Sequence, residues 1–450
     1  MSINERKLDR SPAFAEAAAR FLDAVGEWID ACVARYTATP PSDAPDQLAY
    51  VAAWEPYLRL RPQPAALAFL TQKRDAVQAH FTQTGQWRHG YWMMQDVSRG
   101  VEHFNVFLRT LAQLAPDDPQ TRSQVLDAAE HFGNWKAAVP PWYDAKTKLF
   151  RSHRFGAAGV EELDGQWNIP DHLRGIRLCL LAYSLGGGDR YLAFARDYAG
   201  LWADALLMEQ ELPVGLGADG PLFALNKRAE AFYLGGLGNA DHHTETPIDR
   251  AENFLAAGGI NVFLELWART GEARFLRAAE RLLDLLTPQL PDPDAGAVAD
   301  LLRTYRRLTG SSRYDDAVRS ALASLAPYEI RTIGIQPDVM RLTRLTGVGK
   351  EADMPLWFEN LHLRRHNPIT LAAGAEITGD AILAAQALDI GRVYFELARQ
   401  SLADGCDDGG ANTVAAVARG HRRDNGAGVV TAALQPLIEA FGLVEPAPRR

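Results

Sequence analysis

The feature that most constrains the fold is a helical hairpin that recurs along the chain. In each copy an apolar helix ends at a short turn, and an amphipathic helix follows that often opens with an arginine and an aromatic residue. Glycine suits such a turn because it readily adopts the left-handed conformation that ends a helix. The clearest copies cover 104–132, 176–206, 262–286 and 300–325, and 342–347 looks like another first half. The sequence therefore predicts an all-α protein.

The second helix of each hairpin has one apolar face, illustrated by Leu276, Ala279, Leu282 and Leu283. This spacing marks a buried helical stripe, and a lone hairpin cannot bury it, so neighbouring hairpins must stack. Long polar segments precede the first helices, and insertions on one side of every repeat gather on one face. These segments are 81–100, 150–171, 208–248, 349–368 and 403–427.

The first helices are also more apolar than the second, as an inner ring of helices requires. We therefore predict an (α/α)6-type toroid of helical hairpins with its long loops on one face, and any strands as short excursions in those loops. No low-complexity linker interrupts the chain, so we expect one domain over 1–450. Residues 1–80 would form its N-terminal hairpins, with 37–48 as a proline-rich connection.

Composition narrows the environment and the partners. The net charge of −9 disfavours nucleic acid and anionic membranes, which need basic patches. There is no apolar leader and no run of 18 apolar residues, which predicts a cytoplasmic chain without a membrane span. The three cysteines, Cys32, Cys179 and Cys406, are far apart and fit a reducing compartment, with Cys179 in the core. Homo-oligomer formation is left open.

Chemistry-bearing side chains are concentrated in the long loops, where they would converge if those loops share a face. Aromatic rings stack on the C–H faces of sugars, and arginine with histidine can hold a carboxylate. The candidate catalytic residues are Asp96, Glu102, His103, Asp171, His243, Glu245 and Asp249. The candidate substrate-binding residues are Tyr91, Trp92, Trp167, His172, Arg174, His242, Trp357, Arg365 and His366.

Each of these groups also has a structural interpretation. Asp96 suits a helix N-cap with Trp92 in the core, and Asp171 would stabilise the dipole of the helix that it precedes. The segment 239–253 could be a hydrogen-bonded, solvated loop, and the arginines near 365 could form surface salt bridges. The sequence leaves these alternatives open.

Motifs for metals and cofactors are absent from the sequence. His242, His243 and Glu245 form an HHxE loop rather than the HExxH helix of zinc enzymes, and adjacent residues of an extended loop point in opposite directions. We therefore predict no metal and no cofactor, with metal binding by this loop as the open alternative. Asp407 and Asp408 lack EF-hand spacing, and nucleotide-binding, serine-hydrolase and kinase signatures are missing.

Residues 85–442 resemble the (α/α)-toroid carbohydrate enzymes. The resemblance lies in the apolar helix, the Thr-Gly type of turn and the Arg-Tyr or Arg-Phe helix, with tryptophan, histidine and acids in the loops between. These enzymes include glycoside hydrolases that remove glucuronyl or unsaturated glucuronyl residues, related polysaccharide lyases and sugar 2-epimerases. The resemblance is architectural, and it implies a small carbohydrate substrate.

The residue types allow more than one reaction. A hydrolase needs a carboxylic acid and a carboxylate, whereas a lyase needs a base near a uronate and a cation that neutralises the uronate. A 2-epimerase would use two histidines, and a non-enzymatic repeat scaffold would bind protein instead. The cations in the loops favour an anionic substrate. We therefore expect a glycoside hydrolase acting on a uronic acid-containing oligosaccharide.

Overall fold

Helices form most of the part of the chain that the computed structural model describes. This part comprises residues 11–44, 47–161, 166–208, 211–224, 244–292, 295–325, 328–329, 364–403, 409–410 and 426–441. Its strands are two or three residues long and lie in the loops between helices, as the sequence predicts. The prediction of an all-α fold is confirmed.

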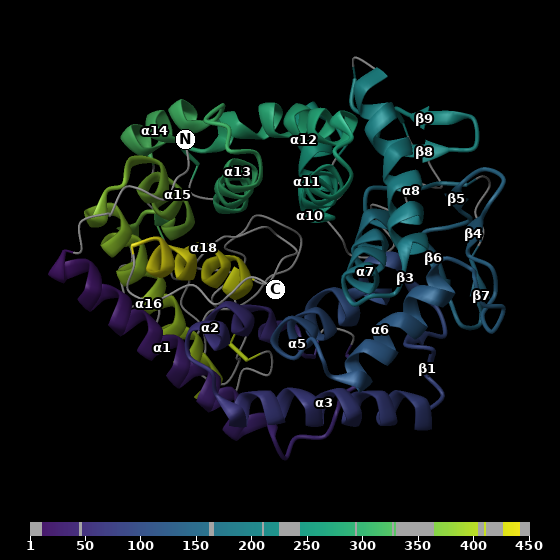
Figure 1. Cartoon of the computed structure of the whole chain (residues 1–450), viewed down its shortest axis with the longest axis horizontal. Helices are drawn as coiled ribbons and strands as arrows, with labels where there is room; N and C mark the ends of the chain where they lie inside the picture. Colours follow the sequence, from purple (N-terminus) through teal and green to yellow (C-terminus); the bar gives the residue numbers. More distant parts are fainter. Residues whose placement is uncertain are drawn as a thin grey trace. The chain divides into compact units, whose positions relative to one another are not determined.

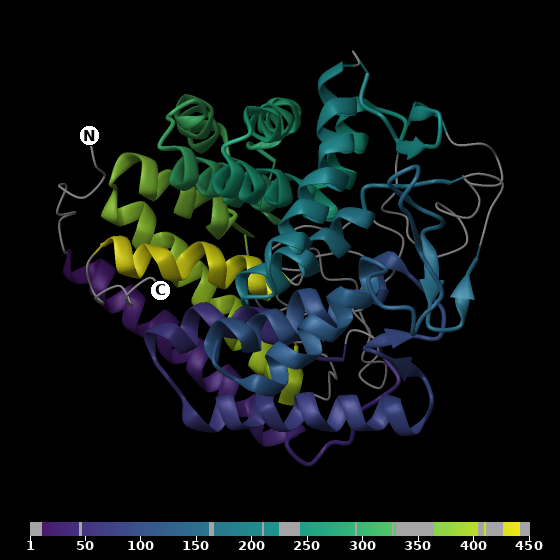
Figure 2. The ribbon, with the colours of Figure 1, turned by 45° about the vertical axis from the view of Figure 1, so that its right-hand side comes forward.

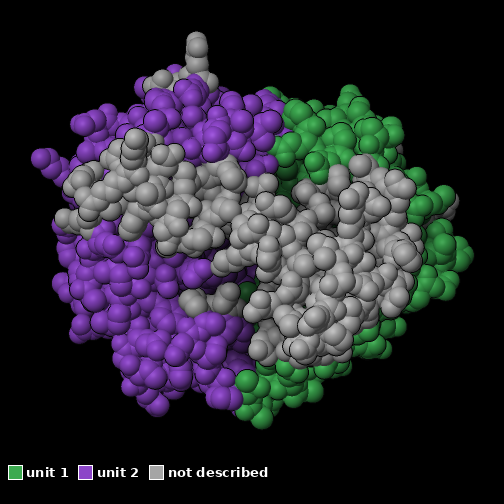
Figure 3. Space-filling view, turned by 180° about the vertical axis from the view of Figure 1, so that it is seen from behind, with its two compact units in different colours: residues 1–39, 49–66, 287–450 green, residues 40–48, 67–286 purple. Residues whose placement is uncertain are grey.

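The chain divides into two compact units, which Figure 3 draws in different colours. Unit 1 comprises Met1–Thr39, Ala49–Ala66 and Thr287–Arg450, and unit 2 comprises Pro40–Leu48 and Leu67–Leu286. The predicted single domain and its closure into one toroid concern both units together, and both stay predictions.

Unit 1 is built on a long helix, α1 (Pro12–Tyr36), that lies along α16 (Ala381–Ala403) (Figure 1). Ser11 caps α1 by accepting a hydrogen bond from the Phe14 amide. Inside the unit, Trp28 packs against Phe395 and donates from Nε1 to the Gly409 carbonyl at 2.6 Å. The other elements are η2 (Ala49–Ala53), α2 (Trp54–Leu60), η5 (Thr287–Gln289), α13 (Gly296–Thr309), α14 (Asp315–Ser324), β10 (Tyr328–Glu329), β11 (Arg364–Arg365), α15 (Pro368–Thr378) and α18 (Gly426–Ala440).

An ionic cluster around the buried side chain of Arg303 joins α13 to α15 in unit 1. Arg303, whose side chain is 2% exposed, and Arg307 both donate to the carboxylate of Glu376. Asp300 completes the cluster with an ion pair to Arg303 at 3.1 Å. Burial acts to raise the pKa of Glu376, but the two arginines outweigh it and lower that pKa. The cluster is therefore charged and balanced inside the unit.

Among its described residues, unit 2 has three helical hairpins that pack on one another in chain order. In the first, the π-helix η3 (Phe104–Leu108) and α5 (Arg109–Leu114) lead to α6 (Pro119–Phe132). The second is α7 (His172–Ser184) with α8 (Asp189–Met208). In the third, α10 (Pro247–Ala256) and α11 (Gly259–Thr270) lead to α12 (Ala273–Leu286) (Figures 1 and 2). Contact between the first two is close, because a Cβ at Gly175 would overlap the ring of Phe132.

Unit 2 also holds most of α3 (Pro64–Gln83), the short helix α4 (Val97–Gly100) and paired strands in the loops. All of these strand pairs are antiparallel, and β3 pairs with β6, which pairs with β7. The strands are β1 (Trp87–Arg88), β2 (Tyr91–Trp92), β3 (Gln95–Asp96), β4 (Tyr143–Asp144), β5 (Leu149–Phe150), β6 (Arg154–Gly156), β7 (Gly159–Val160), β8 (Gly215–Gly217) and β9 (Gly220–Leu222).

The hairpin turns form as the sequence predicts. Gly271 and Gly310 follow α11 and α13 with φ values of 72° and 70°, in the left-handed region. The Arg-aromatic pairs have a structural role, because the guanidinium of Arg274 lies over the ring of Phe275 at 5.0 Å. The same contact occurs at Arg190–Tyr191 and Arg313–Tyr314.

The buried face of α12 differs at one position from the predicted apolar stripe. The buried face of α12 includes Phe275, Ala278, Ala279, Leu282 and Leu283. Leu276, which the pattern assigned to that face, is half-buried, so the stripe is rotated towards Phe275. Cys179 is buried, as predicted. Residues 342–347 lie outside the described part of the chain.

Candidate functional site

The starts of two helices, η3 and α7, meet the end of α10 in unit 2. We call the polar side chains Asn105, Asp171 and Arg174 at these two starts the polar layer. Asn105, in η3, donates from its amide to the Arg174 carbonyl at 2.8 Å. Arg174, in the first turn of α7, donates to the carbonyl of Ala256, at the end of α10. The loops that precede η3 and α7 therefore end close to each other and to the α10–α11 junction.

The centre of the polar layer is an ion pair. Nε of Arg174 lies 3.3 Å from Oδ1 of Asp171, and the two side chains are 13% and 3% exposed. Asp171 stands at the N-cap of α7, where a negative charge interacts favourably with the helix dipole, yet its side chain makes no capping hydrogen bond. Asp171 is therefore a buried carboxylate that pairs with a largely buried arginine and does not cap its own helix.

The π-helix η3 directly follows two other candidates. Glu102 is half-buried and His103 is buried. The π-helical geometry is rare and is frequently found at functional sites. Its presence puts Glu102 and His103 at an irregular helix start beside α7.

The remaining residues of the first loop have clear structural roles. Asp96 caps α4, accepting a 3.0 Å hydrogen bond from the Arg99 amide and a second one from the Ser98 hydroxyl. Trp92 packs edge-to-face on Trp87 at 5.6 Å, and the hydroxyl of Tyr91 donates to a carbonyl of α6. These side chains hold the loop to the helices.

His103 and His172 are both buried and lack the properties of a general base. His103 packs against Trp87 at 4.8 Å, and burial lowers its pKa to about 3. His172 accepts from the Ile169 amide at Nδ1 and donates from Nε2 to the Ser152 carbonyl. Burial lowers the pKa of His172 as well. Both rings are therefore neutral, and both nitrogens of His172 are occupied.

The lowered pKa of His103 gives a testable pH dependence of stability. Between about pH 6.5 and pH 3 the unfolded chain binds a proton at this histidine and the folded chain does not. Stability should therefore rise with pH across that window, by at most about 1.4 kcal/mol per pH unit from this group. Denaturant midpoints at pH 7 and pH 5 should differ less in His103→Gln than in the wild type. An imidazole NMR signal of His103 that titrates near pH 6.5 would contradict this account.

The acids of the third loop begin α10. Thr246 and Asp249 form a capping box, with the Asp249 amide donating to Oγ1 of Thr246 at 3.1 Å and the Thr246 amide donating to the Asp249 carboxylate at 2.9 Å. Glu245 is exposed and accepts from the Thr244 amide. Asp249, which the sequence offered as a catalytic residue, therefore stabilises this end of α10.

Three more of the predicted residues, Trp167, Arg365 and His366, lie in the part of the chain that the structure describes. Trp167 is half-buried in unit 2. His366 is exposed in unit 1, and the backbone of Arg365 pairs with Tyr328 between β11 and β10 of the same unit. His242, His243 and Trp357 lie outside the described residues.

A second group of polar side chains in unit 2 was missed by the predictions. His89, Asp127 and His131 lie together, and among the described residues they form the one cluster of three with metal-ligating side chains at suitable separations. The signal in the sequence is an aspartate and a histidine four residues apart, which share one face of a helix. The partner His89, however, is 38 residues away in sequence from Asp127.

Comparisons with protein-family models, with curated proteins and with solved structures find no match to this chain. Among the described helices, none combines the length and the apolar character needed to cross a bilayer.

Proposed function

We propose that this protein is a glycoside hydrolase that acts on a small, uronic acid-containing oligosaccharide in the cytoplasm, with its reacting groups at the polar layer of unit 2. The observation that carries the proposal is the Asp171–Arg174 ion pair, where the starts of η3 and α7 meet the end of α10. Burying the charges of a carboxylate and a guanidinium costs free energy, because both ions lose their hydration. A buried ion pair is therefore weak evidence for stability, and a functional role would explain why it is present.

Hydrolysis of a glycosidic bond requires two carboxyl groups in different protonation states. Asp171, paired with Arg174, would remain ionised and would activate water or stabilise the oxocarbenium-like transition state. Glu102, one helical turn before Asn105, would donate the proton to the leaving oxygen. Arg174 would also favour a substrate with a carboxylate, since guanidinium binds carboxylates through parallel hydrogen bonds.

A lyase or an epimerase is a weaker alternative, because two of the described histidines of unit 2, His103 and His172, are poorly suited to act as a base. Proton abstraction next to a uronate needs a base whose pKa lies near the working pH. His103 has a pKa of about 3, and His172 uses both ring nitrogens to hold backbone groups. The carboxylates are thus better suited to catalysis than these two histidines.

The test is incubation of the purified chain with a panel of saturated and unsaturated uronides. The proposal expects new reducing ends, and with unsaturated uronides a loss of the 235 nm absorbance. A gain of 235 nm absorbance would indicate a lyase. Sugar interconversion without new reducing ends would indicate an epimerase. No reaction, together with an unchanged melting temperature in the presence of every sugar, would contradict the carbohydrate proposal.

A further inference from the structure

The hairpin β1–β2 carries His89 to a defined place on α6. Trp87 pairs with Trp92 and Arg88 with Tyr91, which leaves His89 and Gly90 as a two-residue turn. Both have positive φ, 56° and 79°, as a type I′ turn requires. A histidine in this conformation is uncommon.

Two contacts fix the hairpin to its neighbours. The hydroxyl of Tyr91 donates to the Ala128 carbonyl of α6 at 2.8 Å. Gly90 lies against Phe104, so closely that a Cβ at this position would approach the ring to 2.6 Å. The ring of His89 is therefore held beside α6 by the packing of its own turn.

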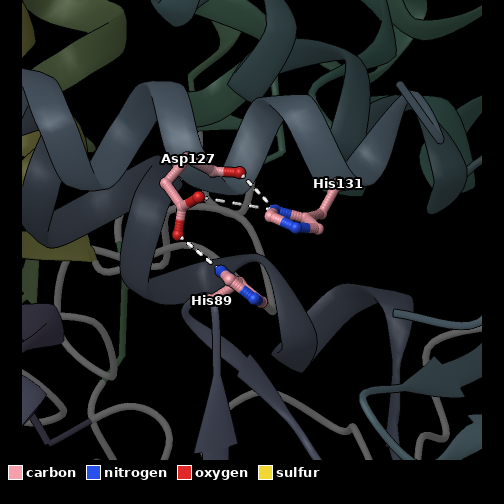
Figure 4. Close-up of side chains that lie close together, drawn as sticks. All are labelled: His89, Asp127 and His131. Carbon is pink, nitrogen blue, oxygen red and sulfur yellow. Dashed lines mark hydrogen bonds and ion pairs between the residues drawn. The ribbon is translucent and has the colours of Figure 1, made fainter. Parts of the chain in front are cut away.

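Asp127 and His131 lie one turn apart on α6 and face His89 (Figure 4). Nδ1 of His89 is 2.9 Å from Oδ2 of Asp127, and Nδ1 of His131 is 3.6 Å from Oδ1. The two imidazole rings stack with their centroids 3.8 Å apart. One ligand atom from each of the three residues lies within 4.8 Å of the other two.

The two ring nitrogens of His131 differ in their hydrogen bonding. Its side chain is 1% exposed, and Nδ1 bonds the Asp127 carbonyl at 2.7 Å. Nε2 is buried and has no hydrogen-bond partner among the described residues. Nε2 is therefore the ring nitrogen of His131 that is available to a metal ion.

We propose that His89, Asp127 and His131 bind a divalent transition-metal ion of the zinc class. Two imidazole nitrogens and a carboxylate oxygen are a ligand set for such ions, whereas magnesium and calcium prefer oxygen ligands alone. Tetrahedral zinc with bonds of about 2.0–2.1 Å places its ligand atoms about 3.3 Å apart. Nδ1 of His89 and Oδ2 of Asp127 are 2.9 Å apart, and one ligand atom from each of the three residues lies within 4.8 Å of the other two, so side-chain rotations can bring the set to this spacing.

The site has an open side. The side chains of His89 and Asp127 are 30% and 39% exposed, whereas His131 lies beneath them. Three protein ligands leave a fourth position for water, as in zinc sites that are not closed. The ion would also tie the β1–β2 turn to α6. This inference is independent of the proposed hydrolase, because it concerns binding of the metal alone.

The experiment is a titration of the chelator-treated full chain with Zn²⁺, followed by calorimetry and thermal melting, and with Co²⁺, followed by its visible absorption. We expect one equivalent to bind per chain and the melting temperature to rise, since an ion bound by the folded state stabilises it. His89→Asn should weaken metal binding by roughly a hundredfold or more. Loss of a residue that only hydrogen-bonds to a metal ligand costs about 10–100-fold in affinity, and loss of a ligand should cost at least as much.

Asparagine is chosen at position 89 because it tolerates the left-handed turn. Asp127→Asn provides a second variant with the same expected loss. The matched control is His80→Asn. His80 also pairs with an aspartate of unit 2, Asp43, at 3.0 Å, but this pair includes no second histidine. Absence of saturable binding would overturn the proposal, and so would binding that both site variants leave unchanged. No enzymatic readout is involved, so failure here leaves the hydrolase proposal to its own test.

Discussion

Replacing Glu376 with glutamine should lower the free energy of unfolding of unit 1 by about 3–5 kcal/mol, as expected when one partner of a buried ionic group is removed. Its carboxylate accepts from Arg303 and Arg307, and the side chains of Glu376 and Arg303 are 12% and 2% exposed. Glutamine keeps the shape but leaves the buried guanidinium of Arg303 with Asp300 as its remaining charged partner in the cluster. Chemical denaturation at pH 7 measures the loss.

A matched control lies on the surface of the same unit. Glu396 forms a 2.6 Å ion pair with Arg392 one turn away on α16, with side chains 43% and 28% exposed. Exposed pairs of this kind contribute about 0.2–1 kcal/mol, so Glu396→Gln should change stability little. Equal effects of the two substitutions would contradict the assignment of Glu376 to a buried cluster.

The carboxylate of Glu376 also predicts a loss of folding stability at acidic pH. The arginines hold its folded pKa below the value near 4.3 of an unfolded glutamate. Its contribution to stability is therefore present above that unfolded pKa and is lost as the pH falls through the lower folded pKa. Glu376→Gln should lose less stability than the wild type between pH 5 and pH 3.

Local rules explain why the fold class was predictable from the sequence. A glycine after an apolar helix, as at Gly271 and Gly310, fixes a turn through the conformation of one residue. The cation–π contact between Arg274 and Phe275 is local as well, because it joins two adjacent residues. Such signals depend on short stretches of chain, whereas closure of the hairpins into a toroid depends on distant ones and stays a prediction.

The candidate site was harder to predict because capping and catalysis use the same residue types. Asp96 and Asp249 are carboxylates at helix starts, and the structure shows each of them bonded to the backbone of its own helix. Asp171 has the same sequence context but pairs with Arg174 instead. The cluster of His89 with Asp127 depends on a turn docking onto a helix 38 residues away, which no local pattern encodes.

If Asp171 is the ionised catalytic carboxylate, Asp171→Asn should reduce kcat on the best uronide by a factor of about 10²–10⁴, the range expected for loss of an acid–base group. Asparagine preserves the volume, and the hydrogen bond from Asn105 to the Arg174 carbonyl remains possible. The charge that would activate water is lost. Steady-state kinetics should therefore show a fall in kcat that exceeds any change in KM.

The control for this variant must separate catalysis from stability, because removing a buried charge also destabilises the fold. Asp315 offers it: the side chain is 8% exposed, stands in the first turn of α14 and pairs with Arg306 at 3.0 Å. Asp315→Asn should lower the melting temperature of unit 1 while kcat per folded molecule stays near the wild-type value. If turnover by Asp171→Asn instead falls only in proportion to its folded fraction, as in the control, Asp171 is a structural residue and the catalytic carboxylates lie elsewhere.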